Sequence, residues 1–442
     1  MRRALFLGLL VACGDDHPTY QDPASIEVAS YAAVASNKLD VLFQMDNTAL
    51  DMQVNFVDSL APLFPAIASI LGPQRSLHIG VVTSDMGTST SMTPTPAFDL
   101  GGCKGKGLDG ALVNYSQSTT ELYLVDEVDG QGAPHVNYTG DLLSTVGTML
   151  EVGALGCGFE QILAGTQRAF ENPVNAGFVR DDANLLVVMI SDEDDCSVRD
   201  QSIFTASPEL GDLQSYRCTH YGVVCDQPID SVGTKTGCHA NEESQLIDPI
   251  GPYVERLKSV KSDPARVAVY AMSGPPTPFA IELRTPPGVT GPPEPALAHS
   301  CAYQGNFGPE VADPAVRLAE FAAGFGANGA FADDCAVNLT PRMAGIAQLV
   351  KNMSGVVCLD TTRLGDSDTL PGVQPLCTVE VDTGPSSTPR AIPACDGASD
   401  DCFEITTDET ACPDTTDHAR LVVHVSTPSP DEYVRASCFA PS

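Results

Sequence analysis

The sequence predicts an α/β fold: a Rossmann-like parallel sheet with helices on both faces, followed by a small disulfide-rich β subdomain at the C-terminus. Short, uniformly apolar runs, typical of strands covered on both faces, alternate with segments of helical periodicity over residues 38–357. Strands that alternate with helices indicate a parallel sheet. Beyond residue 357 the pattern changes to short strand-like runs, turns and six cysteines, which indicates the separate subdomain over 358–442.

Each expected strand is a short apolar run. The expected strands of the sheet are 39–45, 77–83, 185–190, 267–272 and a short one at Phe331, and those of the subdomain are 377–382, 420–425 and 432–438. Helical spacing over 54–67 predicts the first helix, although Pro62 and Pro65 disturb it. Further helices are expected over 141–150, 159–170, 248–261, 313–325 and 340–353, the last three beginning with Asp-Pro or Thr-Pro.

Length and charge restrict the class of protein. The 442 residues are enough for one large core or two, and 23 basic residues against 57 acidic ones give a net charge of −34. A field of this sign repels nucleic acid and anionic lipid head groups. We therefore expect no nucleic-acid partner.

The N-terminus reads as a targeting segment. Arg2 and Arg3 precede a short apolar run that ends at Leu10-Val11-Ala12-Cys13, which is similar to a bacterial lipobox. That similarity implies a signal peptide over 1–12, fatty acylation (palmitate) of Cys13, and a tether over 13–37. Gly14 after the cysteine then implies a lipid-anchored protein of the bacterial envelope, at the outer membrane or cell surface. The alternative is an ordinary cleaved secretory signal.

Export changes the interpretation of the cysteines. Fourteen remain after Cys13, and in an oxidising compartment an even number indicates seven disulfides. Free thiols or a metal cluster are the alternatives. We expect the pairs Cys301–Cys335, Cys358–Cys377, Cys395–Cys402 and Cys412–Cys438, whereas the pairing of Cys103, Cys157, Cys196, Cys218, Cys225 and Cys238 stays open.

Acidic residues follow three of the expected strands. The first strand ends in Asp46-Asn47-Thr48, the second in Asp85, and the third in the acidic run 192–195. Ligands of open α/β sheets bind at the carboxyl ends of the strands. These side chains therefore mark a candidate site.

This pattern resembles the von Willebrand factor type A (VWA) domain, whose first strand ends in Asp-x-Ser-x-Ser and builds a metal-ion-dependent adhesion site. Residues 46–50 match the first carboxylate and the first hydroxyl, but Leu50 stands where the second hydroxyl would be. Together with the GCGFEQ segment at 156–161, the resemblance is to bacterial VWA-containing lipoproteins and covers about residues 38–358.

The resemblance implies a weak site for Mg²⁺ or Ca²⁺, the cations that prefer oxygen ligands. The implied ligands are Asp46, Thr48 and Asp192, assisted by Asp85 or Asp194. In VWA domains a threonine from the loop before a later helix also binds the metal, whereas here Cys157, Gly158 and Glu160 occupy that region.

The sequence offers no catalytic motif: it has no Gly-x-Ser-x-Gly, His-Glu-x-x-His or P-loop. We therefore expect no enzyme, but an envelope-anchored VWA-like lipoprotein that binds a protein or surface partner, with a degenerate divalent-cation adhesion site as the candidate contact. The alternative is a structural envelope lipoprotein whose VWA fold is a metal-free scaffold.

Overall fold

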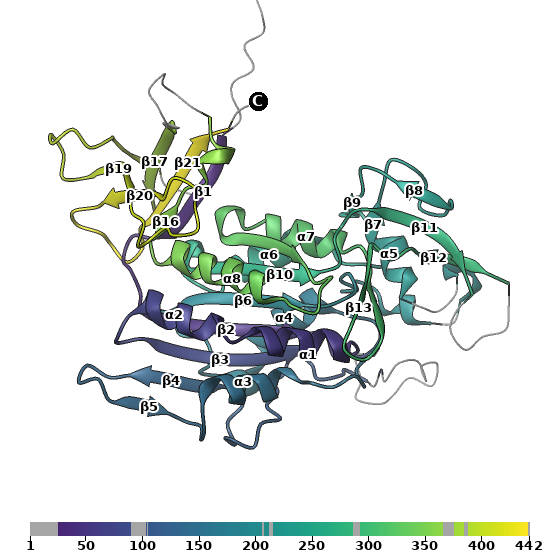
Figure 1. The fold of residues 1–442 in the computed structure, drawn as a ribbon. Coiled ribbons are helices and arrows are strands. Elements are labelled where there is room, and N and C mark those ends of the chain that lie inside the picture. Colours follow the sequence, from purple (N-terminus) through teal and green to yellow (C-terminus); the bar gives the residue numbers. More distant parts are fainter. Residues whose placement is uncertain are drawn as a thin grey trace, which may run out of the picture.

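The computed structural model describes residues 25–89, 103, 105–205, 207–211, 215–285, 292–365, 375–383 and 388–440 (Figure 1). The expected signal peptide and Cys13 lie outside the described residues. Within these residues no single helix has the length and apolar character of a membrane span. The helices α1 Leu50–Ser59 and α2 Leu63–Leu71 have them only when taken together, and the pair is bent by 51°.

A seven-stranded sheet forms the centre of the molecule, in the order β15-β10-β6-β2-β3-β4-β5. The strands β15, β10, β6, β2 and β3 are parallel, whereas β4 runs antiparallel to β3, and β5 runs antiparallel to β4. Their bounds are β2 Lys38–Met45, β3 Ser76–Thr83, β4 Leu124–Val128, β5 Pro134–Val136, β6 Asn184–Ile190, β10 Val267–Ser273 and β15 Gly329–Asp333.

Two apolar clusters lie on opposite sides of this sheet, because alternate side chains of a strand point to opposite faces. Leu39, Val41 and Phe43 of β2 belong to one cluster, and Leu42 to the other. The first cluster includes side chains of α1 Leu50–Ser59, α2 Leu63–Leu71, α3 Leu142–Leu150 and α8 Thr340–Met353. The second includes side chains of α4 Ile162–Glu171, α6 Ile250–Lys258 and α7 Val316–Ala323.

The predicted fold class, a Rossmann-like parallel sheet with helices on both faces, is wrong as a description of the chain. The fold is mixed α/β: the central sheet contains antiparallel strands, and every other sheet in the described residues is antiparallel. The insertions carry short strands that the sequence analysis did not predict, although β11 Phe279–Arg284 has alternating apolar residues. These strands are β7 Val223–Val224, β8 Gly233–Lys235, β9 His239–Ala240, β11 Phe279–Arg284, β12 Glu294–Leu297, β13 Cys301–Gln304 and β14 Pro309–Ala312; the insertion also holds α5 Tyr216–Gly222.

The C-terminal residues form two further antiparallel sheets, β16-β20-β19 and β1-β21-β17-β18, in the upper left of Figure 1. The N-terminal strand β1 pairs with β21, the last strand, so the predicted tether over 13–37 is wrong for the residues of β1. The sequence analysis did not predict β1, because the strand includes exposed polar residues such as Ser25 and Glu27 and its partner β21 is distant in the sequence. The bounds are β1 Ser25–Ala32, β16 Val357–Cys358, β17 Cys377–Asp382, β18 Arg390–Ile392, β19 Cys402–Thr407, β20 Ala419–His424 and β21 Tyr433–Phe439.

Seven disulfides join the fourteen cysteines after Cys13. Cys301–Cys335 and Cys395–Cys402 are paired as expected. The expected pairs Cys358–Cys377 and Cys412–Cys438 are wrong: Cys377 pairs with Cys438, which faces it across β17 and β21, and Cys358 pairs with Cys412. The open pairs are Cys103–Cys157, Cys196–Cys218 and Cys225–Cys238.

A buried ionic cluster lies near the amino ends of the parallel strands. The carboxylate of Asp40 on β2 accepts hydrogen bonds from Arg180 Nε at 2.8 Å and from Lys261 Nζ at 3.1 Å. The side chains of Asp40 and Lys261 are fully buried. Burial lowers the pKa of Lys261, while the charge of Asp40 opposes that shift. The Asp40 carboxylate is therefore the counter-charge that keeps this lysine in the core.

Candidate cation-binding site

The carboxyl ends of neighbouring strands form one row of polar residues. Each residue just past a strand continues the parallel hydrogen-bond pattern by one step, which brings side chains from four chain segments to the same edge. The backbone bonds are Ser84 N to Met45 O (3.3 Å), Asp46 N to Ile190 O (2.9 Å), Ser191 N to Met272 O (3.1 Å) and Asp334 N to Ser273 O (3.1 Å).

Asp46 is the centre of this row and is fully buried. Its Oδ1 accepts hydrogen bonds from Thr48 N at 2.7 Å and Thr48 Oγ1 at 2.8 Å, and its Oδ2 accepts one from Ser191 Oγ at 2.7 Å. The turn after β2 thus orients both side chains of the Asp-x-Thr motif. Ser191 adds a hydroxyl from the neighbouring strand that the sequence analysis did not identify.

Glu160 is the second buried carboxylate of the site. It lies in the segment between α3 and α4, and it contacts Thr48 Oγ1 at 2.9 Å and the hydroxyl of Ser84. The Thr48 hydroxyl has a single proton but lies within hydrogen-bond distance of both Asp46 and Glu160. The hydroxyl therefore cannot donate a full hydrogen bond to both carboxylates at once. Burial, together with the charges of Asp46 and Glu193, raises the pKa of Glu160 well above its usual range.

Gly156 allows the Glu160 segment to approach the first turn. Its N–H donates to Asn47 O at 2.9 Å, and a Cβ at this position would lie 2.0 Å from Asn47 Oδ1. The disulfide Cys103–Cys157 fixes the next residue. A side chain at position 156 would therefore collide with the Asn47 side chain, which would have to move.

Asp192 is the third carboxylate that the structure brings to this edge. Burial raises its pKa well above the usual range, and the charges of Asp46, Glu193 and Asp334 add to this shift. Asp46, Thr48 and Asp192, the expected ligands, therefore lie together. Glu193, the next residue, also faces this acidic environment: burial raises its pKa to about 8, with contributions from Asp313 and Asp46.

The two expected assisting residues have other partners. Asp85 accepts a hydrogen bond from Gly87 N at 2.9 Å, and its Oδ1 lies where a Cβ of Gly107 would be, so it contacts the adjoining glycine-rich loop. Asp194 accepts the N–H groups of Arg317 and Leu318 at 2.9 and 3.1 Å, which places it at the first turn of α7.

Asp51 holds a hairpin instead of replacing the hydroxyl that is missing at Leu50. Its carboxylate accepts the N–H groups of Asn306 and Phe307, at 3.2 and 3.3 Å, from the turn between β13 and β14. This turn is thereby fastened to the start of α1, next to the acidic site.

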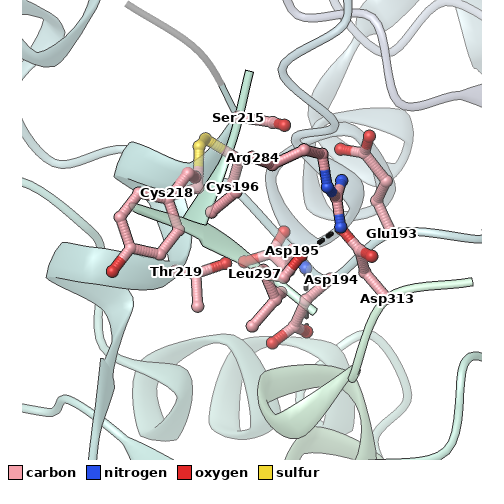
Figure 2. A pocket seen from close by; sticks show the side chains of 12 residues that line it. Glu193, Asp194, Asp195, Cys196, Ser215, Cys218, Thr219, Arg284, Leu297 and Asp313 are labelled. Carbon is pink, nitrogen blue, oxygen red and sulfur yellow. Dashed lines mark hydrogen bonds between the residues drawn. A yellow bond between two sulfur atoms is a disulfide. The ribbon is translucent and has the colours of Figure 1, made fainter. Parts of the chain in front are cut away.

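The acidic run also borders a small cavity of about 70 Å³ (Figure 2). Glu193, Asp313 and Arg284 line it, with Leu297 and the disulfide Cys196–Cys218. The Arg284 guanidinium donates to Leu297 O at 2.8 Å, and Asp194 points away from it toward α7. The cavity is thus lined by the acidic run and by residues of the inserted strands β11 and β12.

The residues at this edge fit a hard divalent cation. The atoms that could bind a metal are all oxygens. Within the described residues, no lysine or arginine forms an ion pair with Asp46, Glu160, Asp192 or Asp334. Buried carboxylates without a counter-charge are costly unless they are protonated or bind a cation. Two buried oxygens, Asn47 Oδ1 and Asp334 Oδ2, also have no hydrogen-bond partner among the described residues. Oxygen donors of this kind suit Mg²⁺ or Ca²⁺.

A second acidic group of described residues does not fit a metal. The ligand atoms of Cys301, Asp334 and Cys335 lie within 4.8 Å of one another. Both sulfurs, however, belong to one disulfide and cannot act as thiolate ligands.

Stability without divalent cations is expected to fall as the pH rises from about 4 to 8. The carboxyls of Asp334 and Glu193 have folded-state pKa values of about 7 and about 8, above the unfolded values near 4. The folded state therefore holds more protons than the unfolded state between these pH values. For each extra proton, the unfolding free energy falls by about 1.4 kcal/mol when the pH rises by one unit.

Urea unfolding at several pH values, with chelator or with excess Ca²⁺, measures this effect. Taking the difference between the two series removes contributions from residues away from the site, such as His78. A difference that does not grow with pH would contradict the prediction.

Comparisons with known proteins give little further information. No family model matches the sequence, and no curated protein matches it. Similar solved structures include the adhesive tip pilin GBS104 from Group B Streptococcus agalactiae, with 10% identity over 95% of this chain and 81% of that chain, at a TM-score of 0.29. The pilus adhesin RrgA from Streptococcus pneumoniae shows 11% identity over 94% of this chain and 58% of its own length, at a TM-score of 0.30. These similarities are too low to assign fold or function.

Proposed function

We propose that this protein is a cation-dependent binding protein of the bacterial envelope that holds a protein or surface partner at the carboxyl edge of its central sheet. The observation that supports this most is the set of buried carboxylates around Asp46 that have no basic partner among the described residues. A bound divalent cation would supply the missing positive charge and an electrophilic coordination position for an oxygen of the partner. Asp46, Thr48, Glu160, Ser191 and Asp192 would hold it.

The resemblance to VWA adhesion sites is part of this proposal, as is the lipid anchor at Cys13. Both explain why an acidic binding edge would belong to an exported chain. The proposal rests on the side chains at this edge and not on the similarity to the streptococcal proteins.

Exposed apolar side chains beside the edge favour a protein as the partner. Leu155 is 94% exposed and adjoins Gly156, which contacts Asn47. Phe307, 68% exposed, and Leu50, 44% exposed, flank the contact between the hairpin turn and Asp51. Large apolar side chains around a charged centre are typical of protein interaction surfaces, where they contribute much of the binding energy.

Millimolar Mg²⁺ or Ca²⁺ is expected to raise the melting temperature of the wild-type protein relative to chelator. A ligand that binds only the folded state stabilises it by about 2.7 kcal/mol at a hundredfold excess over Kd. The Asp46→Ala variant should lose this response, because Asp46 orients both hydroxyls of the site.

Asp85→Ala is the matched control, since Asp85 also follows a parallel strand but contacts the loop at Gly87. It should retain the response to the cation. Equal loss in both variants would mean that general acidity, and not this site, binds the cation.

The alternative function is a metal-free scaffold, and Leu50 is the observation that favours it. This half-exposed apolar side chain replaces a hydroxyl beside a site that requires water. If the melting temperature of the wild type is the same with cation and with chelator, the carboxylates only cap loops and the scaffold is the better account.

A further inference from the structure

Asp334 is a buried carboxylate that neither the sequence pattern nor the proposed ligand set includes. It follows β15, two strands away from β6, and its side chain is almost completely buried, with 1% exposure. Its Oδ2 has no hydrogen-bond partner among the described residues. Its neighbour Asp333 differs: it is half-exposed and forms an ion pair with Arg342 at 2.8 Å.

The charge of Asp334 acts on the cation site. Burial raises the pKa of Asp334 to about 7, and the charges of Asp333 and Asp46 add to this shift. Asp334 in turn raises the pKa of Asp192. In the strand order β15-β10-β6-β2, Asp192 after β6 thus lies between Asp46 after β2 and Asp334 after β15, and the acidic row extends across the edge of four strands.

Two covalent or hydrogen-bonded connections hold Asp334 in this place. Its N–H donates to Ser273 O at 3.1 Å, which continues the pairing of β10 with β15. The next residue, Cys335, forms a disulfide with Cys301 at the base of the β13–β14 hairpin. The backbone at this buried carboxylate is therefore fixed on both sides. A fixed position is what a side chain that binds a ligand requires.

We infer that Asp334 is a further binding residue of the cation site, which supplies negative charge to the bound cation from the side of β15. This inference rests on the proposed function, because it requires a cation at Asp46 and Asp192. It also explains why a buried carboxylate without a partner occurs at this strand end. In the absence of a cation the same charge is a cost to stability.

The Asp334→Asn variant tests this inference because it should raise stability without the cation and weaken the binding of the cation. In chelator at pH 8 the variant should melt at a higher temperature than the wild type, since a buried unpaired charge is removed. With Ca²⁺ present the rise in melting temperature should be smaller than in the wild type. Calorimetric titration should show a Kd increased about tenfold or more, the usual effect of removing a supporting group near a metal.

Asp333→Asn is the matched control, because it removes the same charge one residue earlier from a side chain that has a basic partner. Its Kd for Ca²⁺ should stay within about twofold of the wild-type value. If Asp334→Asn has the same Kd as Asp333→Asn, Asp334 is not part of the site, although the cation site itself stands. If the wild type binds no cation, the proposed function fails first, and this inference fails with it.

Discussion

The Asp40→Asn variant is expected to unfold with a free energy about 3–5 kcal/mol lower than that of the wild type. Asp40 is fully buried and accepts hydrogen bonds from Arg180 and Lys261. The amide keeps the shape but not the charge, so the ammonium group of Lys261 remains buried without a counter-charge. Removing one partner of a buried ion pair usually has a cost of this size. Urea unfolding at pH 7 measures it.

The exposed pair of Lys38 and Asp182 provides the control for this measurement. Asp182→Asn makes the same chemical change in an exposed ion pair. It should lower the unfolding free energy by less than about 1 kcal/mol, because water solvates the remaining lysine. Equal effects of the two substitutions would contradict the importance assigned to burial of the Asp40 cluster.

The second large effect is expected for Arg317→Met, with a loss of about 3–5 kcal/mol. Arg317 on α7 is fully buried and donates to Asp195 Oδ2 at 2.9 Å and to Asp248 O at 2.8 Å. Methionine fills much of the same volume but leaves the Asp195 carboxylate buried without its positive partner. That carboxylate also accepts the N–H of Leu163 at the first turn of α4, so two helices lose a common anchor.

The response to divalent cations should survive in Arg317→Met at temperatures where the variant is folded. Within the acidic run, Arg317 forms hydrogen bonds with Asp194 and Asp195, and among the described residues none is found to a proposed ligand. Arg342→Met, which breaks the half-exposed pair with Asp333, is the control and should cost less than about 1 kcal/mol. A complete loss of cation binding in Arg317→Met would mean that the two halves of the acidic run act as one unit.

Much of the candidate site could be predicted from local sequence, because strand ends place their residues at one edge of a sheet. Asp46, Thr48 and Asp192 were found in this way. Asp334 carries the same signal, an aspartate just past the expected strand at Phe331, and the same reasoning could have identified it. Glu160 gives a weaker signal, since it belongs to an irregular segment whose position depends on Gly156 and on the disulfide of Cys157.

Other features depend on contacts that are distant in the sequence. Asp85 and Asp194 follow strands as Asp46 does, but a glycine-rich loop and the first turn of α7 occupy their carboxylates. Local patterns do not show these partners. The wrong disulfide pairs have the same cause, because Cys377 meets Cys438 only after β17 and β21 have paired.

The pairing of β1 with β21 has a consequence for the order of folding. The first described strand, β1, is synthesised long before β21, the strand beside which it lies. During that interval β1 has no native partner, and its hydrogen-bonding groups are available to other chains or to chaperones. Contacts of such large sequence separation form slowly. The β1-β21-β17-β18 sheet therefore forms late in folding, and a chain truncated before β21 could not complete it.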